Sequence, residues 1–172
     1  LGTMHTERTR QVAQIINELN EEQHVDVVAF TDGALKPAED AADGTRKVAC
    51  GVYEGVCAAN LQHVAYGHAL PPECEVPEAE LEAVRLVLER ADKKARSEHQ
   101  PGHGVIVIDS ESCFGEMEHV WAAENLGELE GMGRALMHEL ILERRRRIEE
   151  HGGSVRLVWV PSHVGIYPNA YA

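Results

Sequence analysis

The sequence predicts an α/β domain built on a mixed five-stranded sheet, and three observations lead to this class. The chain has 172 residues, which is the size of one ordinary domain. Two apolar runs rich in Val and Ile, at 25–30 and 105–108, are typical of strands that are buried on both faces. Segments with helical periodicity separate such runs, and this alternation favours parallel strands joined by crossover helices.

The first part of the chain is expected to contain one helix and three strands. Segment 6–20 carries an apolar stripe at helical spacing. The stripe consists of Val12, Ile15, Ile16 and Leu19. A buried strand at 25–33 is expected to end in an Asp-Gly turn, and the polar stretch 36–46 indicates a loop. Segments 47–54 and 63–69 are close enough in sequence to form an antiparallel hairpin.

The second part alternates helices and strands. A helix is expected from Pro77 to about Ala95, because proline is tolerated in a first helical turn. The strand at 105–108 leads into Asp109, and a short helix is expected within 110–125. A long helix at 131–151 and a last strand at 155–160 complete the chain. The three buried strands should be parallel neighbours, and the hairpin should lie antiparallel beside the first of them.

The charge of the chain limits its classes of partner. Sixteen Lys and Arg against 29 Asp and Glu give a net charge of −13, which excludes a globally basic nucleic-acid-binding domain. A local basic patch or bound metal ions would still allow contact with nucleic acid. We see no apolar run near the roughly 20 residues of a membrane span and no secretory signal. We therefore expect an intracellular protein, nuclear or cytoplasmic, with no membrane partner.

Three acidic residues are expected to converge at one edge of the sheet. Asp32 and Asp109 end two buried parallel strands, and ligands bind at the carboxyl ends of such strands. At 100° per residue, Glu80 falls inside the apolar arc of its helix, whereas its charged neighbours fall outside and are expected to face water. The arc consists of Leu81, Val84, Val87, Leu88 and Ala91, and the outward neighbours are Glu78, Glu82, Arg85 and Glu89.

Each acid also has an ordinary structural explanation. Glu80 could form a salt bridge, Asp32 could bond the backbone of Gly33 in a turn, and Asp109 could cap the next helix. Three acids that converge without a matching Lys or Arg, however, need a cation to offset their repulsion. Ligands that are all oxygen favour Mg²⁺ or Mn²⁺ over Zn²⁺.

Four motifs, in this order, carry a family resemblance. They are Phe30-Thr31-Asp32-Gly33, Glu78-Ala79-Glu80-Leu81, Val107-Ile108-Asp109-Ser110 and Trp159-Val160-Pro161-Ser162-His163-Val164-Gly165-Ile166. Each is weak alone, but their order and their places on strands and helices are specific. Together they resemble ribonuclease H, most closely the version carried by LINE-type retrotransposon reverse transcriptases. The resemblance covers about 25–172.

The resemblance implies a ribonuclease H-like fold and an endonuclease that cuts the RNA strand of RNA–DNA hybrids. It implies two Mg²⁺ ions, which Mn²⁺ can replace, in a cluster of four carboxylates. Asp32, Glu80 and Asp109 match three of these catalytic and metal-binding positions, and His163 matches a mobile histidine that assists proton transfer or product release. The matching substrate-binding positions are Gly33, Ser110, Glu111 and Asn169. The implied partners are the hybrid and the reverse transcriptase part of the same polyprotein.

The sequence also departs from the family pattern. After His163 it follows the pattern through Asn169 and ends at Ala172, one residue before the expected fourth carboxylate. Glu111 stands where the family often has Gln, and Ala170 where it often has an acid. We therefore expect an N-terminal helix or linker at 1–22, then a ribonuclease H-like domain at 23–172 that is truncated at its C-terminal end and poorly active.

Two other functions remain open at this stage. One is a catalytically impaired module that binds or scaffolds, and the other is a metal nuclease of the same superfold that acts on DNA. The basic run Arg144–Arg147 has two interpretations. Its side chains could contact substrate phosphates, or they could form ion pairs with Glu143, Glu149 and Glu150 on a solvated helix.

Overall fold

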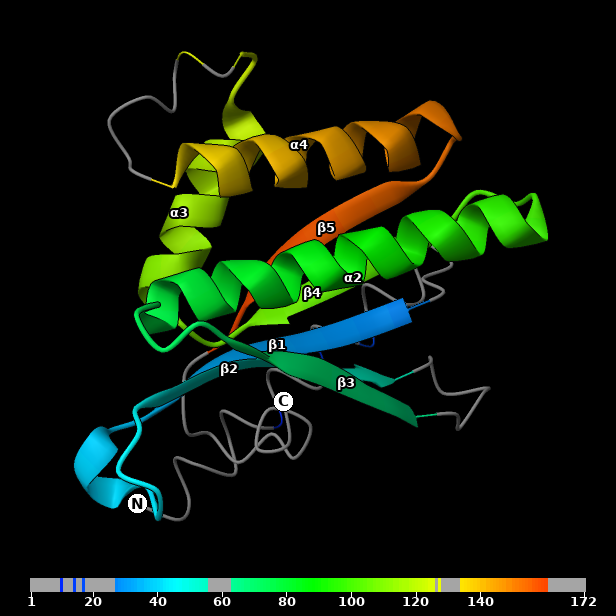
Figure 1. Ribbon diagram of the computed structural model, residues 1–172. Coiled ribbons are helices and arrows are strands. Elements are labelled where there is room, and N and C mark those ends of the chain that lie inside the picture. Colours follow the sequence, from blue (N-terminus) through cyan, green and yellow to red (C-terminus); the bar gives the residue numbers. More distant parts are fainter. Residues whose placement is uncertain are drawn as a thin grey trace.

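The computed structural model describes residues 10, 14, 17, 27–55, 63–125, 127 and 134–160 (Figure 1). The five strands are β1 (Val27–Lys36), β2 (Lys47–Gly55), β3 (His63–Leu70), β4 (His103–Ile108) and β5 (Ser154–Trp159). The helices are α2 (Val76–Glu98), α3 (Glu111–Ala122), α4 (Ala135–Glu150) and the short 3₁₀ helix η1 (Ala38–Asp40). Of the helix expected at 6–20, only Arg10, Gln14 and Asn17 are described, and all three are helical.

The five strands form one mixed sheet in the order β3-β2-β1-β4-β5. The hairpin strands β2 and β3 pair antiparallel, β2 pairs antiparallel with β1, and β1, β4 and β5 are parallel neighbours. The predicted α/β class and the predicted strand directions are therefore confirmed.

The described helices α2, α3 and α4 lie on one face of the sheet (Figure 1). Alternate strand residues face them, including Ala29 of β1 and Ile106 of β4, and pack against Leu81 and Leu88 of α2. A second buried cluster uses the intervening residues, such as Phe30 and Val107. Burial on both faces explains why these strand sequences show no apolar–polar alternation.

Two predicted boundaries were wrong. Strand β1 does not end in a turn at Asp32, because residues 33–36 continue to pair with β2, from Gly33 with Cys50 to Lys36 with Lys47. Helix α4 begins at Ala135 and not near residue 131. Arg134 has a left-handed backbone conformation with φ of 54°, which cannot extend the helix backward.

None of the helices in the described ranges is long and apolar enough to cross a membrane. Cys50, Cys74 and Cys113 are free thiols, and Cys57 lies outside the described residues.

Candidate active site

Asp32 and Asp109 lie side by side where the parallel pairing of β1 and β4 stops. The last pair in that register is Thr31 with Ile108, so the two aspartates are the next residue on each strand. Neighbouring strands lie about 4.8 Å apart, which brings the two positions close together. Asp32 also accepts a hydrogen bond from the Gly33 backbone at 2.9 Å, so this local contact exists within a continuous strand.

Glu80 reaches this edge of the sheet from the first turns of α2, as its place in the apolar arc predicts. Its residue is only 9% exposed. Gly33 makes the approach possible, because a Cβ atom there would lie 2.9 Å from the Glu80 Cγ atom and 2.9 Å from the Val76 carbonyl oxygen. A side chain at position 33 would therefore push α2, and Glu80 with it, away from the aspartates.

The three acids interact electrostatically. The pKa of the Glu80 carboxyl is raised from 4.5 to about 7, chiefly by burial, while a hydrogen bond with Ser110 opposes the shift. The charges of Asp32 and Asp109 raise the pKa further. Within the described residues no Lys or Arg forms an ion pair with Glu80. The alternative of a salt bridge within the described residues therefore does not explain this buried acid.

Ser110, and not Asp109, caps the helix that follows β4. Its hydroxyl accepts a hydrogen bond from the Cys113 backbone at 3.2 Å, which corrects the alternative of an Asp109 cap. The charge of Asp109 acts instead on the Glu80 carboxyl, whose pKa it raises. Glu111 is exposed in the first turn of α3, where its charge is favoured by the helix dipole.

A fourth acid, Glu116, acts on the cluster and was not predicted from the sequence. The charge of Glu116, on α3, also raises the pKa of Glu80. Glu116 accepts hydrogen bonds from Arg134 at 3.1 and 3.0 Å and lies 2.8 Å from the Nε2 atom of buried His138. Burial alone would raise the pKa of Glu116, but these two partners hold it below its usual range. Glu116 lies three residues after buried Cys113, so the helical-arc argument used for Glu80 could have identified it.

The acid cluster has the chemistry of a divalent-cation site. Carboxylate oxygens are the ligands that Mg²⁺ and Mn²⁺ prefer, and a cation would relieve the repulsion that raises the pKa of Glu80. Among the described residues, however, no group of three His, Cys, Asp or Glu side chains is arranged to hold a metal ion. Metal binding would therefore require the carboxylates to turn toward a common point.

Two of the predicted site residues, His163 and Asn169, lie outside the described residues. A third expectation is corrected, because Glu82 does not face water. It is buried between α2 and β3, where it pairs with Arg85 and with His68, whose Nε2 atom lies 3.0 Å away. The buried surface of α2 is wider than its apolar arc because β3 and α4 also flank the helix.

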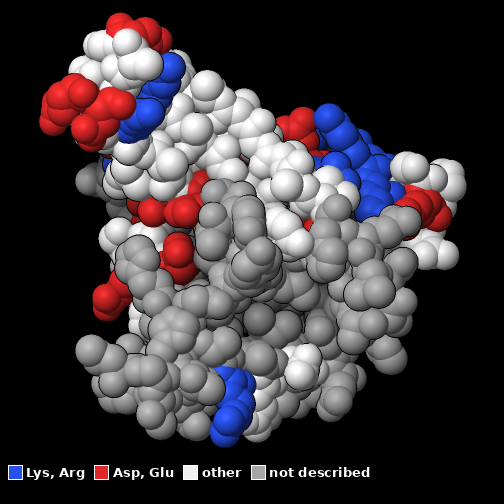
Figure 2. All heavy atoms as spheres, turned by 90° about the horizontal axis from the view of Figure 1, so that it is seen from below, with Lys and Arg blue, Asp and Glu red and all other residues white. Residues whose placement is uncertain are grey.

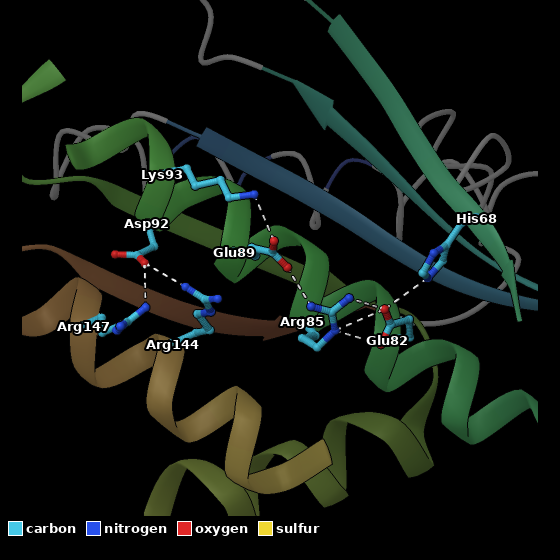
Figure 3. A network of polar contacts seen from close by, with 8 residues as sticks. All are labelled: His68, Glu82, Arg85, Glu89, Asp92, Lys93, Arg144 and Arg147. Carbon is cyan, nitrogen blue, oxygen red and sulfur yellow. Dashed lines mark hydrogen bonds and ion pairs between the residues drawn. The ribbon is translucent and has the colours of Figure 1, made fainter. Parts of the chain in front are cut away.

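The run Arg144–Arg147 makes contacts within the protein. Arg145 pairs with Glu149 at 2.8 Å and stacks on the ring of Trp121, and Arg147 lies 3.9 Å from Glu143. The interpretation of ion pairs on the helix is confirmed for these two residues. Arg144 and Arg147 also contact Asp92 of α2, which the sequence did not suggest (Figure 3).

The described basic side chains do not form one continuous surface on the face seen from below. Figure 2 shows the described Lys and Arg residues as separate patches, with acidic patches beside some of them. This distribution agrees with the net charge of −13.

Comparison with known proteins gives the fold. No protein-family model and no curated protein matches the chain. Among solved structures, the ribonuclease H domain of prototype foamy virus matches with a TM-score of 0.64 and 16% identity, over 86% of this chain and 89% of that domain. Ribonuclease H1 of the archaeon Halobacterium salinarum matches with a TM-score of 0.52 and 15% identity, over 85% of this chain and 93% of that one.

Two further matches are an enzyme solved in a complex and a larger viral protein. LC11-RNase H1, isolated from compost and solved with an RNA/DNA hybrid, matches with a TM-score of 0.53 and 15% identity, over 84% of this chain and 92% of that one. The prototype foamy virus protease–reverse transcriptase matches with a TM-score of 0.58 and 17% identity, and the chain spans 19% of its length. The fold is therefore ribonuclease H-like, similar to both retroviral and cellular examples.

Proposed function

We propose that this chain is a metal-dependent endonuclease that hydrolyses the RNA strand of RNA–DNA hybrids. The observation that carries the proposal is Glu80, a buried acid whose pKa is raised to about 7 beside two aspartates. Acids with shifted pKa values are common at functional sites. Burial and nearby like charges destabilise the folded protein, but they also prepare the acid for binding or proton transfer. The ribonuclease H-like fold, which one similar structure uses to bind an RNA/DNA hybrid, supports this choice of reaction.

In this proposal Asp32, Glu80 and Asp109 hold Mg²⁺, or Mn²⁺ in its place. When bound, two such ions activate the attacking water and stabilise the leaving oxygen. Ser110 helps to orient the Glu80 carboxyl through its hydrogen bond. We assign His163 to proton transfer or product release.

Substrate contacts are proposed at four positions, Gly33, Ser110, Glu111 and Asn169. The Cα of Gly33 faces α2, so only its backbone remains for a substrate. The Ser110 hydroxyl already caps α3, and Glu111 presents an exposed negative charge. A carboxylate near nucleic-acid phosphates weakens binding, so we expect low affinity for the hybrid.

A nuclease assay tests the proposal. Labelled hybrid, duplex DNA and duplex RNA are each incubated with the chain in Mg²⁺, in Mn²⁺ and in EDTA. We expect only the hybrid to be cut, and only with metal, because recognition of the RNA strand uses its 2′-hydroxyl groups. Asp32→Asn should abolish cleavage, whereas Glu118→Gln, which removes an exposed acid of α3, should not. Equal cleavage of duplex DNA would refute the choice of substrate.

A non-catalytic module that binds or scaffolds is the second candidate. It is favoured by the lack of a three-ligand metal group among the described residues. Binding of the hybrid without cleavage in either metal would support this candidate and exclude the nuclease.

The parent protein is also a proposal. Similarity to the foamy virus protease–reverse transcriptase supports a place in a retroelement polyprotein, next to a reverse transcriptase, and the sequence motifs point to the LINE type. Sequencing the surrounding open reading frame would test this placement, and a frame without reverse transcriptase motifs would contradict it.

A further inference from the structure

A second electrostatic feature of the molecule lies between the C-terminal halves of α2 and α4. Asp92 of α2 is buried, with only 2% of its side chain exposed. Three guanidinium groups surround its carboxylate: Arg96 at 3.2 Å, Arg144 at 3.1 Å and Arg147 at 3.9 Å. We call Arg96, Arg144 and Arg147 the arginine cluster, and Figure 3 shows two of its members with Asp92.

The charges in the arginine cluster do not balance. One carboxylate neutralises one guanidinium, and among the described residues the other acid that pairs with the cluster is exposed Glu143, 3.9 Å from Arg147. The other network in Figure 3 differs, because two acids, Glu82 and Glu89, face two basic side chains, Arg85 and Lys93. Cations are favoured at helix C-termini by the helix dipole, but the dipole does not require three of them around one acid.

The arginine cluster keeps most of its hydrogen-bonding capacity. Each guanidinium has five N–H donors, and the contacts with other described residues use few of them. The side chains of Arg96, Arg144 and Arg147 are 46%, 27% and 38% exposed, so their free donors reach solvent. Arg96 also lines an open cavity of about 490 Å³ together with His99, Gln100 and His151. Planar guanidinium groups with spare donors match the oxygens of a phosphate group.

We propose that the arginine cluster binds phosphates of a nucleic-acid backbone. The inference rests on the proposed function, because the nucleic acid is taken to be the hybrid that enters the acid cluster. Glu80 and Asp92 are twelve residues apart on α2, which corresponds to about 18 Å at 1.5 Å per residue. A duplex strand advances about 3.4 Å per nucleotide, so the contacted phosphate lies about five nucleotides from the acid cluster.

Hybrid binding in EDTA tests the site without any cleavage. The double variant Arg96→Gln/Arg147→Gln removes two of the three positive charges and keeps the Asp92–Arg144 contact that joins the helices. Its charge-matched control is Arg146→Gln/Arg156→Gln, which removes two exposed arginines outside the cluster.

The cluster variant should bind a 16-base-pair hybrid roughly 5- to 20-fold more weakly at low salt, and the slope of log K against log salt should fall by about 1 to 2. The control should lose less affinity. If both double variants bind and respond to salt alike, the effect is one of net charge, and the site does not exist. If the double variant fails to fold, the single variant Arg147→Gln replaces it, because Arg147 makes the longest contact with Asp92. An unchanged slope of log K against log salt in this variant would overturn the inference.

A series of hybrids of different length locates the site. Each hybrid is extended by one base pair at a time on one side of a fixed blocked cleavage position. Affinity should rise when the extension passes about five nucleotides on one side, and the cluster variant should lack this rise. Competition with inorganic tripolyphosphate separates a general phosphate site from one that needs a duplex. Arginine-dependent binding without cleavage would retain this inference and refute the proposed nuclease. Cleavage of the hybrid without a rise in affinity with length would support the nuclease and refute this inference.

Discussion

The two ends of α2 each bury a carboxylate in opposite surroundings. Glu80, near the N-terminal end, lies among acids, and its pKa is raised to about 7. Asp92, twelve residues later, lies among three arginines. Sequence position on the helix does not distinguish them, because both are acids on the buried side of α2.

This difference distinguishes an acid that stabilises the fold, Asp92, from an acid that is prepared for function, Glu80. Removing a carboxylate that arginines surround leaves unpaired charges, so Asp92 should stabilise the contact between α2 and α4. Removing a carboxylate that acids surround relieves repulsion, so Glu80 should cost stability in the absence of a cation. The two residues should therefore respond to substitution with opposite signs.

The largest effect is expected for Asp92→Ala. Loss of this buried acid should destabilise the chain by roughly 3–4 kcal/mol, because Arg144 and its neighbours would face one another without an anion. Urea unfolding at pH 7 measures the change, with Glu98→Ala, an exposed acid at the end of the same helix, as the control. A loss below 1 kcal/mol would show that Asp92 is not a structural anchor.

Glu80→Gln is expected to change stability in the other direction. The folded pKa of about 7 exceeds the ordinary 4.5, so the folded state holds the proton more tightly, and stability falls as pH rises from 4.5 to 7. The variant should be more stable than the native chain by roughly 2–3 kcal/mol at pH 8 and nearly equal to it at pH 4. The same gain at both pH values would mean that charge is not the cause.

A divalent cation should remove the penalty at Glu80. At Mn²⁺ tenfold above its dissociation constant, the native chain should gain about 1.4 kcal/mol, and Glu80→Gln should gain less because it has lost a ligand. Thermal unfolding at pH 8 with Mn²⁺ or EDTA measures both. Equal gains would show that the ion binds elsewhere and would count against the proposed acid cluster.

The smallest effect is expected for Ser110→Ala. Loss of the cap of α3 should cost about 1 kcal/mol. The same change removes the hydrogen bond that lowers the pKa of Glu80, so this pKa should rise further. The loss of stability that begins above pH 4.5 should therefore become steeper near pH 7 and continue to higher pH. Ser112→Ala, two residues further along the chain, is the control. A pH profile like that of the native chain would show that Ser110 acts on the helix alone.

Much of the fold was determined by the sequence alone. The Val- and Ile-rich runs specified buried strands, and the Asp109 that follows the second run marked the edge where the acids meet. The 100° periodicity placed Glu80 on the buried side of its helix, and its burial confirmed this. These features are local, since periodicity and burial along one element depend on neighbours within that element.

Partners between elements were decided only by the tertiary structure. Glu82 is buried because β3 flanks the helix, and Asp92 meets Arg144 because α4 packs beside α2. The charge of Glu116 acts on Glu80 because α3 starts directly after β4 and lies over the same sheet edge. A sequence specifies which face of an element is apolar, but it does not show which element will cover that face. Only the packed structure decides whether a buried acid meets arginines or other acids.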